Sequence, residues 1–144
     1  PVLFKSLALS ILGNPEGFRP EEVVDYSLNG VEIAPNIVYL EGSWKNSNDN
    51  MELMSDSGRV VLIYYAKALN IVAGGNPNEI EVKLDGNYLA DDKGEDVIIE
   101  SGKSVSQISG HRLYNLVSAD SYGAHTIEII PTSPGLRIYT FTFG

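Results

Sequence analysis

The chain has 144 residues, of which 43% are hydrophobic and 20% charged, so it is the size of one globular domain and is not a disordered polymer. Its formal net charge of -9 excludes partners held by their phosphates, such as nucleic acids and anionic lipid surfaces. The absence of cysteine excludes disulfides and thiolate metal sites. Because no apolar run approaches the ~20 residues of a membrane span, we expect no direct membrane insertion.

The first 35 residues read differently from the rest. Residues 3–12 place apolar side chains at helical spacing, which predicts a short amphipathic helix ended by Gly13 and Pro15, or alternatively an extended arm packed across a sheet. Left uncovered, this apolar stripe would be a docking face. Residues 21–27 are consistent with one helical turn. We therefore predict that residues 1–35 are an N-terminal arm or linker packed on a domain formed by 36–144.

Beyond Pro35 the pattern becomes that of short strands. Residues 59–67 are apolar on both faces, as in a strand buried within a sandwich. In 79–86, Ile80, Val82 and Leu84 alternate with polar residues, and Asp85-Gly86 indicates a hairpin turn. Further predicted strands are 37–42, 51–54, 69–74, 87–90, 96–100, 112–118, 124–130 and 135–144.

The chain closes on one of its most strand-like segments, GLRIYTFTFG. Strict alternation places Tyr139, Phe141 and Phe143 on one face, which predicts a closing strand with one packed face. Together with the preceding segments this makes about nine or ten short antiparallel strands. The predicted fold is an all-β jelly-roll sandwich with a short N-terminal helix or arm.

Several segments, in this order, resemble a known family: GSW (42–44), GRVVLIYYAK (58–67), LNIV (69–72), VKLDG (82–86), RLYNLV (112–117), HTIEI (125–129) and IYTFTFG (138–144). The order is similar to the C-terminal, carbohydrate-binding-module-like domain of DipZ-type proteins. These are thioredoxin-family membrane proteins related to cytochrome c biogenesis factors. The resemblance covers roughly residues 36–144.

The resemblance implies a jelly-roll module that follows a thioredoxin-like domain in an extracytoplasmic (periplasmic or cell-surface) setting, with that upstream domain as a partner. It carries over no redox residue, because the chain has no CxxC motif. Any thiol–disulfide oxidoreductase activity would lie in an upstream domain. Carbohydrate is the ligand that the resemblance suggests.

No catalytic constellation can be assembled from the sequence. His111 and His125 are the two histidines, and neither belongs to an HExxH or similar metal-binding spacing. There is no GxSxG elbow and no phosphate-binding glycine loop. We therefore expect a protein that is not an enzyme.

One acidic turn, DDKGED, gathers Asp91, Asp92, Glu95 and Asp96. Clustered carboxylates supply the oxygen ligands that calcium prefers, so this turn is a candidate calcium site. It lacks the DxDxDG spacing, and the alternative is a solvated turn. No other cofactor is expected.

Aromatic residues in loops are the stronger indication of a ligand, because sugar rings stack their apolar faces on tryptophan and tyrosine. The candidates are Trp44 beside a polar loop, Tyr88 after the Asp85-Gly86 turn, Tyr122 in ADSYGAH, and His111 after a Ser-Gly turn. Each has a structural alternative, and Trp44 in particular could cap the core.

The sequence thus predicts a non-catalytic accessory module that binds carbohydrate. The alternative is a structural or protein-interaction domain that orients a neighbouring thioredoxin-like domain and has no small-molecule ligand.

Overall fold

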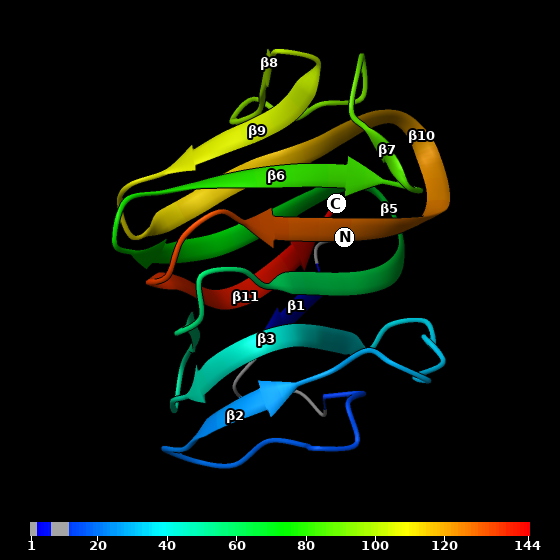
Figure 1. Ribbon diagram of the computed structural model, residues 1–144. Coiled ribbons are helices and arrows are strands. Elements are labelled where there is room, and N and C mark those ends of the chain that lie inside the picture. Colours follow the sequence, from blue (N-terminus) through cyan, green and yellow to red (C-terminus); the bar gives the residue numbers. More distant parts are fainter. Residues whose placement is uncertain (1–2, 7–11) are drawn as a thin grey trace.

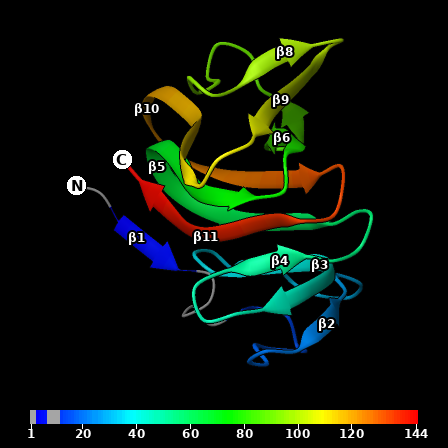
Figure 2. The ribbon, with the colours of Figure 1, turned by 90° about the vertical axis from the view of Figure 1, so that its left-hand side faces the viewer.

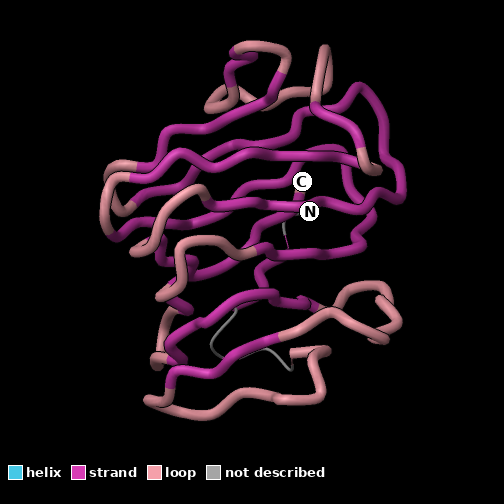
Figure 3. The backbone as a smooth tube through the Cα atoms, in the orientation of Figure 1, coloured by secondary structure: helices cyan, strands magenta, loops and turns pink. Residues whose placement is uncertain are grey.

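The computed structural model describes residues 3–6 and 12–144, and in this part of the chain every regular element is a strand (Figures 1 and 3). None of the described residues forms a helix that could cross a membrane. The eleven strands are β1 (Leu3–Ser6), β2 (Val23–Tyr26), β3 (Val38–Asn46), β4 (Met51–Leu53), β5 (Arg59–Gly75), β6 (Asn78–Leu84), β7 (Asn87–Tyr88), β8 (Ile98–Glu100), β9 (Lys103–Ile108), β10 (Arg112–Pro131) and β11 (Leu136–Phe143).

The strands form two layers because β5 and β10 are long enough to run through both of them. In the first layer, sheet I, the order is β2, β3, the first half of β5, the second half of β10, β6, β9 and β8 (Figure 1). In the second layer, sheet II, β1, β11, the second half of β5 and the first half of β10 lie side by side. The predicted all-β sandwich of antiparallel strands is confirmed.

The corner between the two sheets is an irregularity in the β5–β10 ladder. Ser118 lies opposite Ala68, but the next pair is Gly123 opposite Ala66, so four residues of β10 (119–122) stand against the single residue Lys67 of β5. The carbonyl of Gly144 accepts hydrogen bonds from the backbone N–H groups of both Lys67 (2.8 Å) and Ala68 (3.1 Å). Gly144 therefore satisfies backbone N–H groups of β5 at the corner. The bulge at this place lets β5 and β10 turn from one sheet into the other.

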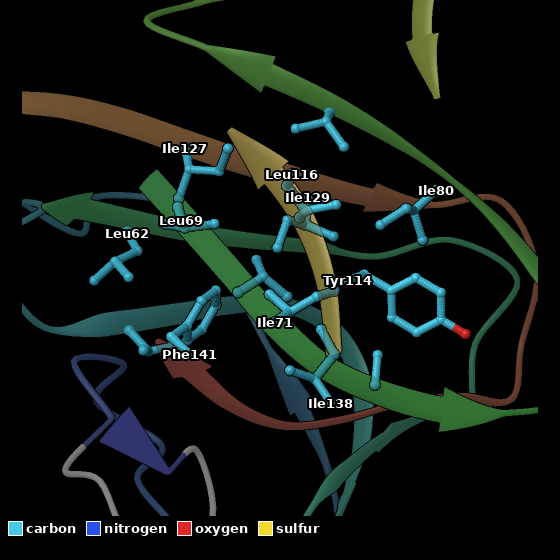
Figure 4. Close-up of a cluster of buried hydrophobic side chains, with 14 of the residues drawn as sticks. Leu62, Leu69, Ile71, Ile80, Tyr114, Leu116, Ile127, Ile129, Ile138 and Phe141 are labelled. Carbon is cyan, nitrogen blue, oxygen red and sulfur yellow. The ribbon is translucent and has the colours of Figure 1, made fainter. Parts of the chain in front are cut away.

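Side chains from both sheets meet in one apolar core (Figure 4). Alternate residues of sheet I, such as Leu62, Ile127 and Ile129, face Ile71 and Phe141 of sheet II, and all of them are fully buried. The predicted inward row on β6 is also confirmed, since Ile80, Val82 and Leu84 are buried.

The N-terminal segments are strands where helical structure was predicted. Residues 3–6 form β1, which pairs with β11, so the helix prediction is wrong there and the extended alternative fits; residues 7–11 lie outside the described part of the chain. Residues 23–26 form β2 on β3, which makes the helical turn over 21–27 wrong as well. In both places a free sheet edge satisfies the backbone better than an isolated helical turn, which is marginal in water.

The closing strand β11 lies beside β1 and β5 (Figure 2). Its register shifts between Ile138 and Thr140, so a bulge interrupts the alternation. Ile138, Phe141 and Phe143 therefore all reach the core, whereas Tyr139 turns to the outer face. The prediction that Tyr139 shares a face with Phe141 and Phe143 is wrong because strict alternation does not survive the bulge.

The phenol of Tyr64, a residue only 2% exposed, is buried without a hydrogen-bond partner in the described part of the chain. Burial raises its pKa, and the carboxylates of Asp85 and Asp92 raise it further. Because an unpartnered buried hydroxyl costs about 1–3 kcal/mol, we expect Tyr64→Phe to leave the free energy of unfolding unchanged or to raise it by up to about 1 kcal/mol, measured by urea denaturation.

The matched control for this variant is Tyr114→Phe. The Tyr114 hydroxyl donates to the Gly110 carbonyl (2.6 Å) and accepts from the N–H groups of Ser109 (3.1 Å) and Gly110 (3.0 Å). Its removal should cost about 1–3 kcal/mol. Equal losses in the two variants would contradict the difference in hydrogen bonding.

The contacts of Asp96 should make the free energy of unfolding depend on pH in the acidic range. Partial burial acts to raise the pKa of Asp96, but hydrogen bonds from Arg112 (3.0 Å) and from the Asn115 N–H (2.7 Å) outweigh it and lower the pKa below its ordinary value of 3.8. The unfolded chain therefore binds this proton more readily. The stabilisation is present above pH 3.8 and is lost as the pH falls through the lowered value.

Asp96→Asn should accordingly lose less stability on acidification than the unchanged protein, measured as urea midpoints from neutral pH to below 3.8. The exposed Asp91→Asn is the control for removing one carboxylate. An identical acid dependence in the Asp96 variant would contradict the assignment.

Candidate functional site

The outer face of sheet I, which points away from the core, carries the candidate site. On β5 Arg59, Ile63, Tyr65 and Lys67 face outward, since Val60, Leu62, Tyr64 and Ala66 are buried in the core; Val61, at an outward position as well, is buried. On β6, Glu81 and Lys83 face outward for the same reason. This face thus combines charged side chains with tyrosines from three elements, β5, β7 and the extra residues of β10.

Tyr65 and Tyr122 form an exposed aromatic pair at the corner, which we call the tyrosine platform. Their ring centroids are 6.2 Å apart and the ring planes differ by 13°. Tyr65 is 66% exposed and Tyr122 52% exposed. The Nζ atom of Lys67 lies 5.2 Å from the centroid of the Tyr122 ring, a cation–π contact that helps to orient it.

The local sequence explains why these rings remain open. The irregular pairing between Ser118 and Gly123 places Tyr122 beside Tyr65. Gly123 and Ala124 follow it, and Ala124 lies directly opposite Tyr65, so these two positions place no large side chain over the rings; Lys67 is the side chain that contacts Tyr122. Two adjacent aromatic rings expose apolar surface to solvent that folding would normally bury. Such a surface suits a ligand with apolar ring faces and polar edges.

Tyr88 belongs to the same face. Its hydroxyl donates to the carboxylate of Glu81 (2.7 Å), and the Nζ atom of Lys83 lies 5.0 Å from its ring centroid. The hydrogen bond to Glu81 raises the pKa of Tyr88. The turn before Tyr88 is held to β10 by Asp85, whose carboxylate contacts the ring of His125 (2.6 Å) and accepts from the Thr126 N–H (2.8 Å).

Trp44 is fully buried on β3, and its indole N–H donates to the Glu41 carbonyl (2.9 Å). The prediction of Trp44 as a stacking residue is therefore wrong, because neither face of the ring can reach a ligand. Its pairing with Leu53 on β4 makes it part of the core.

His111 is exposed but lies on sheet II, not on the face that carries the tyrosines. Its ring stacks on Tyr139 at a centroid distance of 4.2 Å with the planes 12° apart. The structure thus brings Tyr88 and Tyr122 to one face and separates His111 from them.

The carboxylates of the acidic turn make separate contacts. Asp96 is held by Arg112 and by the Asn115 N–H, and one carboxylate oxygen of Asp92 accepts from the Ala90 N–H (3.0 Å). Asp91 and Asp92 line a pocket of about 280 Å³ with Asp120, Ser118 and two alanines. Among the described residues no group of three or more His, Asp or Glu side chains is arranged to hold a metal. Calcium binding by Asp91, Asp92, Glu95 and Asp96 stays a prediction.

His125 and Asp85 are a histidine–carboxylate pair, which is one part of many catalytic sites. A Cβ atom added to Gly123 would lie 3.0 Å from the Nε2 atom of His125, so this nitrogen faces backbone rather than a nucleophile. In the described part of the chain, neither residue lines the acidic pocket or the groove described below. The pair ties the β6–β7 turn to β10.

Tyr65 and Arg59 were not predicted as site residues from the sequence. Both lie in 59–67, which reads as apolar on both faces, but Arg59, Tyr65 and Lys67 open one of those faces to solvent. The signal was the Tyr64-Tyr65 pair, since adjacent strand residues point to opposite faces and one of the two must face outward.

The fold is similar to those of several solved structures. The fold superposes on a family two carbohydrate esterase from Cellvibrio japonicus with a TM-score of 0.61 and 12% identity, over 99% of this chain but 34% of the esterase, so the chain spans about a third of that protein. The C-terminal CBM6 of LamC from Zobellia galactanivorans gives a TM-score of 0.45 at 12% identity over 99% of this chain and 98% of that one. CsCBM6-3 from Clostridium stercorarium, in complex with cellobiose, gives 0.38 at 11% identity over 96% and 90%.

No curated protein matches the chain. A family model described as "Thioredoxin like C-terminal domain" matches residues 7–144, nearly the whole sequence. The chain therefore belongs to the thioredoxin-like C-terminal domain family.

Proposed function

We propose that this domain is a non-catalytic accessory module that binds carbohydrate, with the tyrosine platform as the surface on which a sugar ring stacks. The single observation that supports it is the pair Tyr65–Tyr122, two nearly parallel rings of which more than half of each residue is in water. A sugar ring offers an apolar C–H face to such rings while its hydroxyls stay hydrated or reach polar neighbours. Stacking removes apolar surface from water at little entropic cost, because tyrosine has only two side-chain torsions.

The polar neighbours suit a neutral sugar. Lys67 lies against one ring, and Ser121 and Asp120 precede Tyr122 in the sequence. The overall charge of -9 disfavours strongly acidic polysaccharides. A neutral glycan avoids that repulsion and still finds hydrogen-bond partners beside the rings.

We further propose that the module is the C-terminal part of a DipZ-type, extracytoplasmic protein and follows a thioredoxin-like domain. The membership of the family and the order of the segments from GSW to IYTFTFG support this context. In that setting the module would bind glycans at the cell surface. It would thereby keep the neighbouring redox domain close to that surface.

The test is a screen of the purified domain on an array of neutral oligosaccharides, followed by titration calorimetry on a binder. We expect Tyr65→Ala and Tyr122→Ala each to weaken binding by at least about tenfold, since central aromatic contacts commonly contribute more than 1 kcal/mol. Circular dichroism checks that each variant keeps its sheet structure.

The matched control is His111→Ala, which removes an exposed, stacked ring from sheet II. It should leave the affinity unchanged, and so should EDTA. Binding that is lost with His111 but kept without Tyr65 and Tyr122 would place the site on the opposite sheet. A folded domain that binds no glycan would favour the alternative, a module that orients a neighbouring domain.

A further inference from the structure

A groove of about 520 Å³ lies on the outer face of sheet I, away from the tyrosine platform. Its lining comes from β3, β5, β6, β10 and the 57–58 turn, and includes Glu41, Ser57, Arg59, Lys83, Glu128 and Ile130. The volume is within the range of roughly 300–1,000 Å³ that is usual for small-ligand sites. Unlike the platform, the groove is predominantly polar in its side chains.

Arg59 is the centre of this groove. Its guanidinium contacts Glu128 at 2.9 Å through Nη1 and Glu41 at 3.4 Å through Nε. The Nε atom is buried and lacks a hydrogen bond of good geometry within the described residues. The arginine is therefore held in place by two carboxylates while part of its donor capacity stays unused.

The charges in the groove balance. Arg59 and Lys83 supply two cations, and Glu41 and Glu128 supply two carboxylates. In the described part of the chain Lys83 forms no ion pair and instead contacts the ring of Tyr88. A neutral ligand rich in hydroxyls meets both donors and acceptors here, whereas a charged ligand would leave one sign of charge uncompensated.

The groove and the platform are aligned along the same strands. Arg59 and Tyr65 both face outward on β5, six residue steps apart, which at roughly 3.3 Å per residue is about 20 Å. Between them lie two cross-strand pairs of β5 and β10, Val61 with Glu128 and Ile63 with Thr126. Val61 is buried, and the other three residues are half-buried.

We propose that the domain binds an extended neutral oligosaccharide along β5 and β10, with one end of the chain on the tyrosine platform and a later sugar unit in the Arg59 groove. This inference rests on the proposed function and adds its substrate class: a linear glycan of several units rather than a single sugar. Two contact surfaces on one chain raise affinity because the second contact is made at high effective concentration.

The experiment is titration calorimetry of the whole domain with a neutral oligosaccharide series, from monosaccharide to hexasaccharide, of the sugar type that binds on the array. For the unchanged protein we expect the affinity to rise by at least about tenfold from disaccharide to hexasaccharide. In Arg59→Gln and Lys83→Ala this rise should largely disappear. Arg59→Lys keeps the charge between the two carboxylates and removes only the planar fork, so it tests the groove if Arg59→Gln fails to fold.

Arg137→Gln is the matched control. Arg137 pairs with Glu52 at 2.9 Å on another part of the surface, so the variant also breaks an arginine–carboxylate pair. It should retain the full dependence on chain length.

Two outcomes would overturn the inference while leaving the proposed function intact. One is binding that depends on Tyr65 and Tyr122 but not on chain length. The other is length-dependent binding that all three groove variants retain. A domain that binds no member of the series would overturn both.

Discussion

The structure depends on the pairing of β5 with β10, the two strands that belong to both sheets. Their ladder is regular from Ala66–Gly123 to Val60–Ile129 and again beyond Ala68–Ser118, apart from a second shift near Asn115. At the corner between these stretches, the Gly144 carbonyl holds the N–H groups of Lys67 and Ala68. Inward-facing residues are even-numbered before this corner (Leu62, Tyr64) and odd-numbered after it (Leu69, Ile71), so without the irregularity one half of β5 would turn its apolar side outward.

The same irregularity creates the candidate site. Residues 119–122 of β10 bulge out of the ladder opposite the single residue Lys67, and one of them, Tyr122, lies beside Tyr65. The groove at the other end depends instead on regular register, since Arg59 lies between Glu41, its partner on β3, and the outward Glu128 of β10. The tyrosine platform thus depends on a bulge, and the Arg59 groove depends on a regular ladder. As a result the outer face of sheet I is aromatic at the corner and carries ion pairs along the strands.

The strands with clear period-2 patterns could be read from the sequence, and so could the sandwich. Residues 79–86 illustrate this, because burial of Ile80, Val82 and Leu84 is a local consequence of alternation. What could not be read depends on partners far along the chain. β9 (KSVSQI) looks polar, yet Ser104 and Ser106 are buried, and the Ser104 hydroxyl donates to the Val82 carbonyl. Likewise Tyr139 faces outward because of a register shift against β5, which no local pattern reveals.

The candidate site was predictable in part for the same reason. Tyr122 was predicted because its segment ADSYGAH reads as a polar loop, although the structure places it in a bulge of β10; Trp44 stands beside a polar segment as well and is fully buried. Exposure of an aromatic ring is decided by its pairing partners, so loop context alone cannot separate the two. The positions of these residues also bear on ligand binding. Tyr65 and Arg59 lie on a strand, and Tyr122 is held by a stacked ring and a lysine, so most of the contact surface is already ordered before a ligand arrives. Little conformational entropy of the protein then remains to be lost on binding, which is what the proposed binding of a flexible glycan requires of its surface.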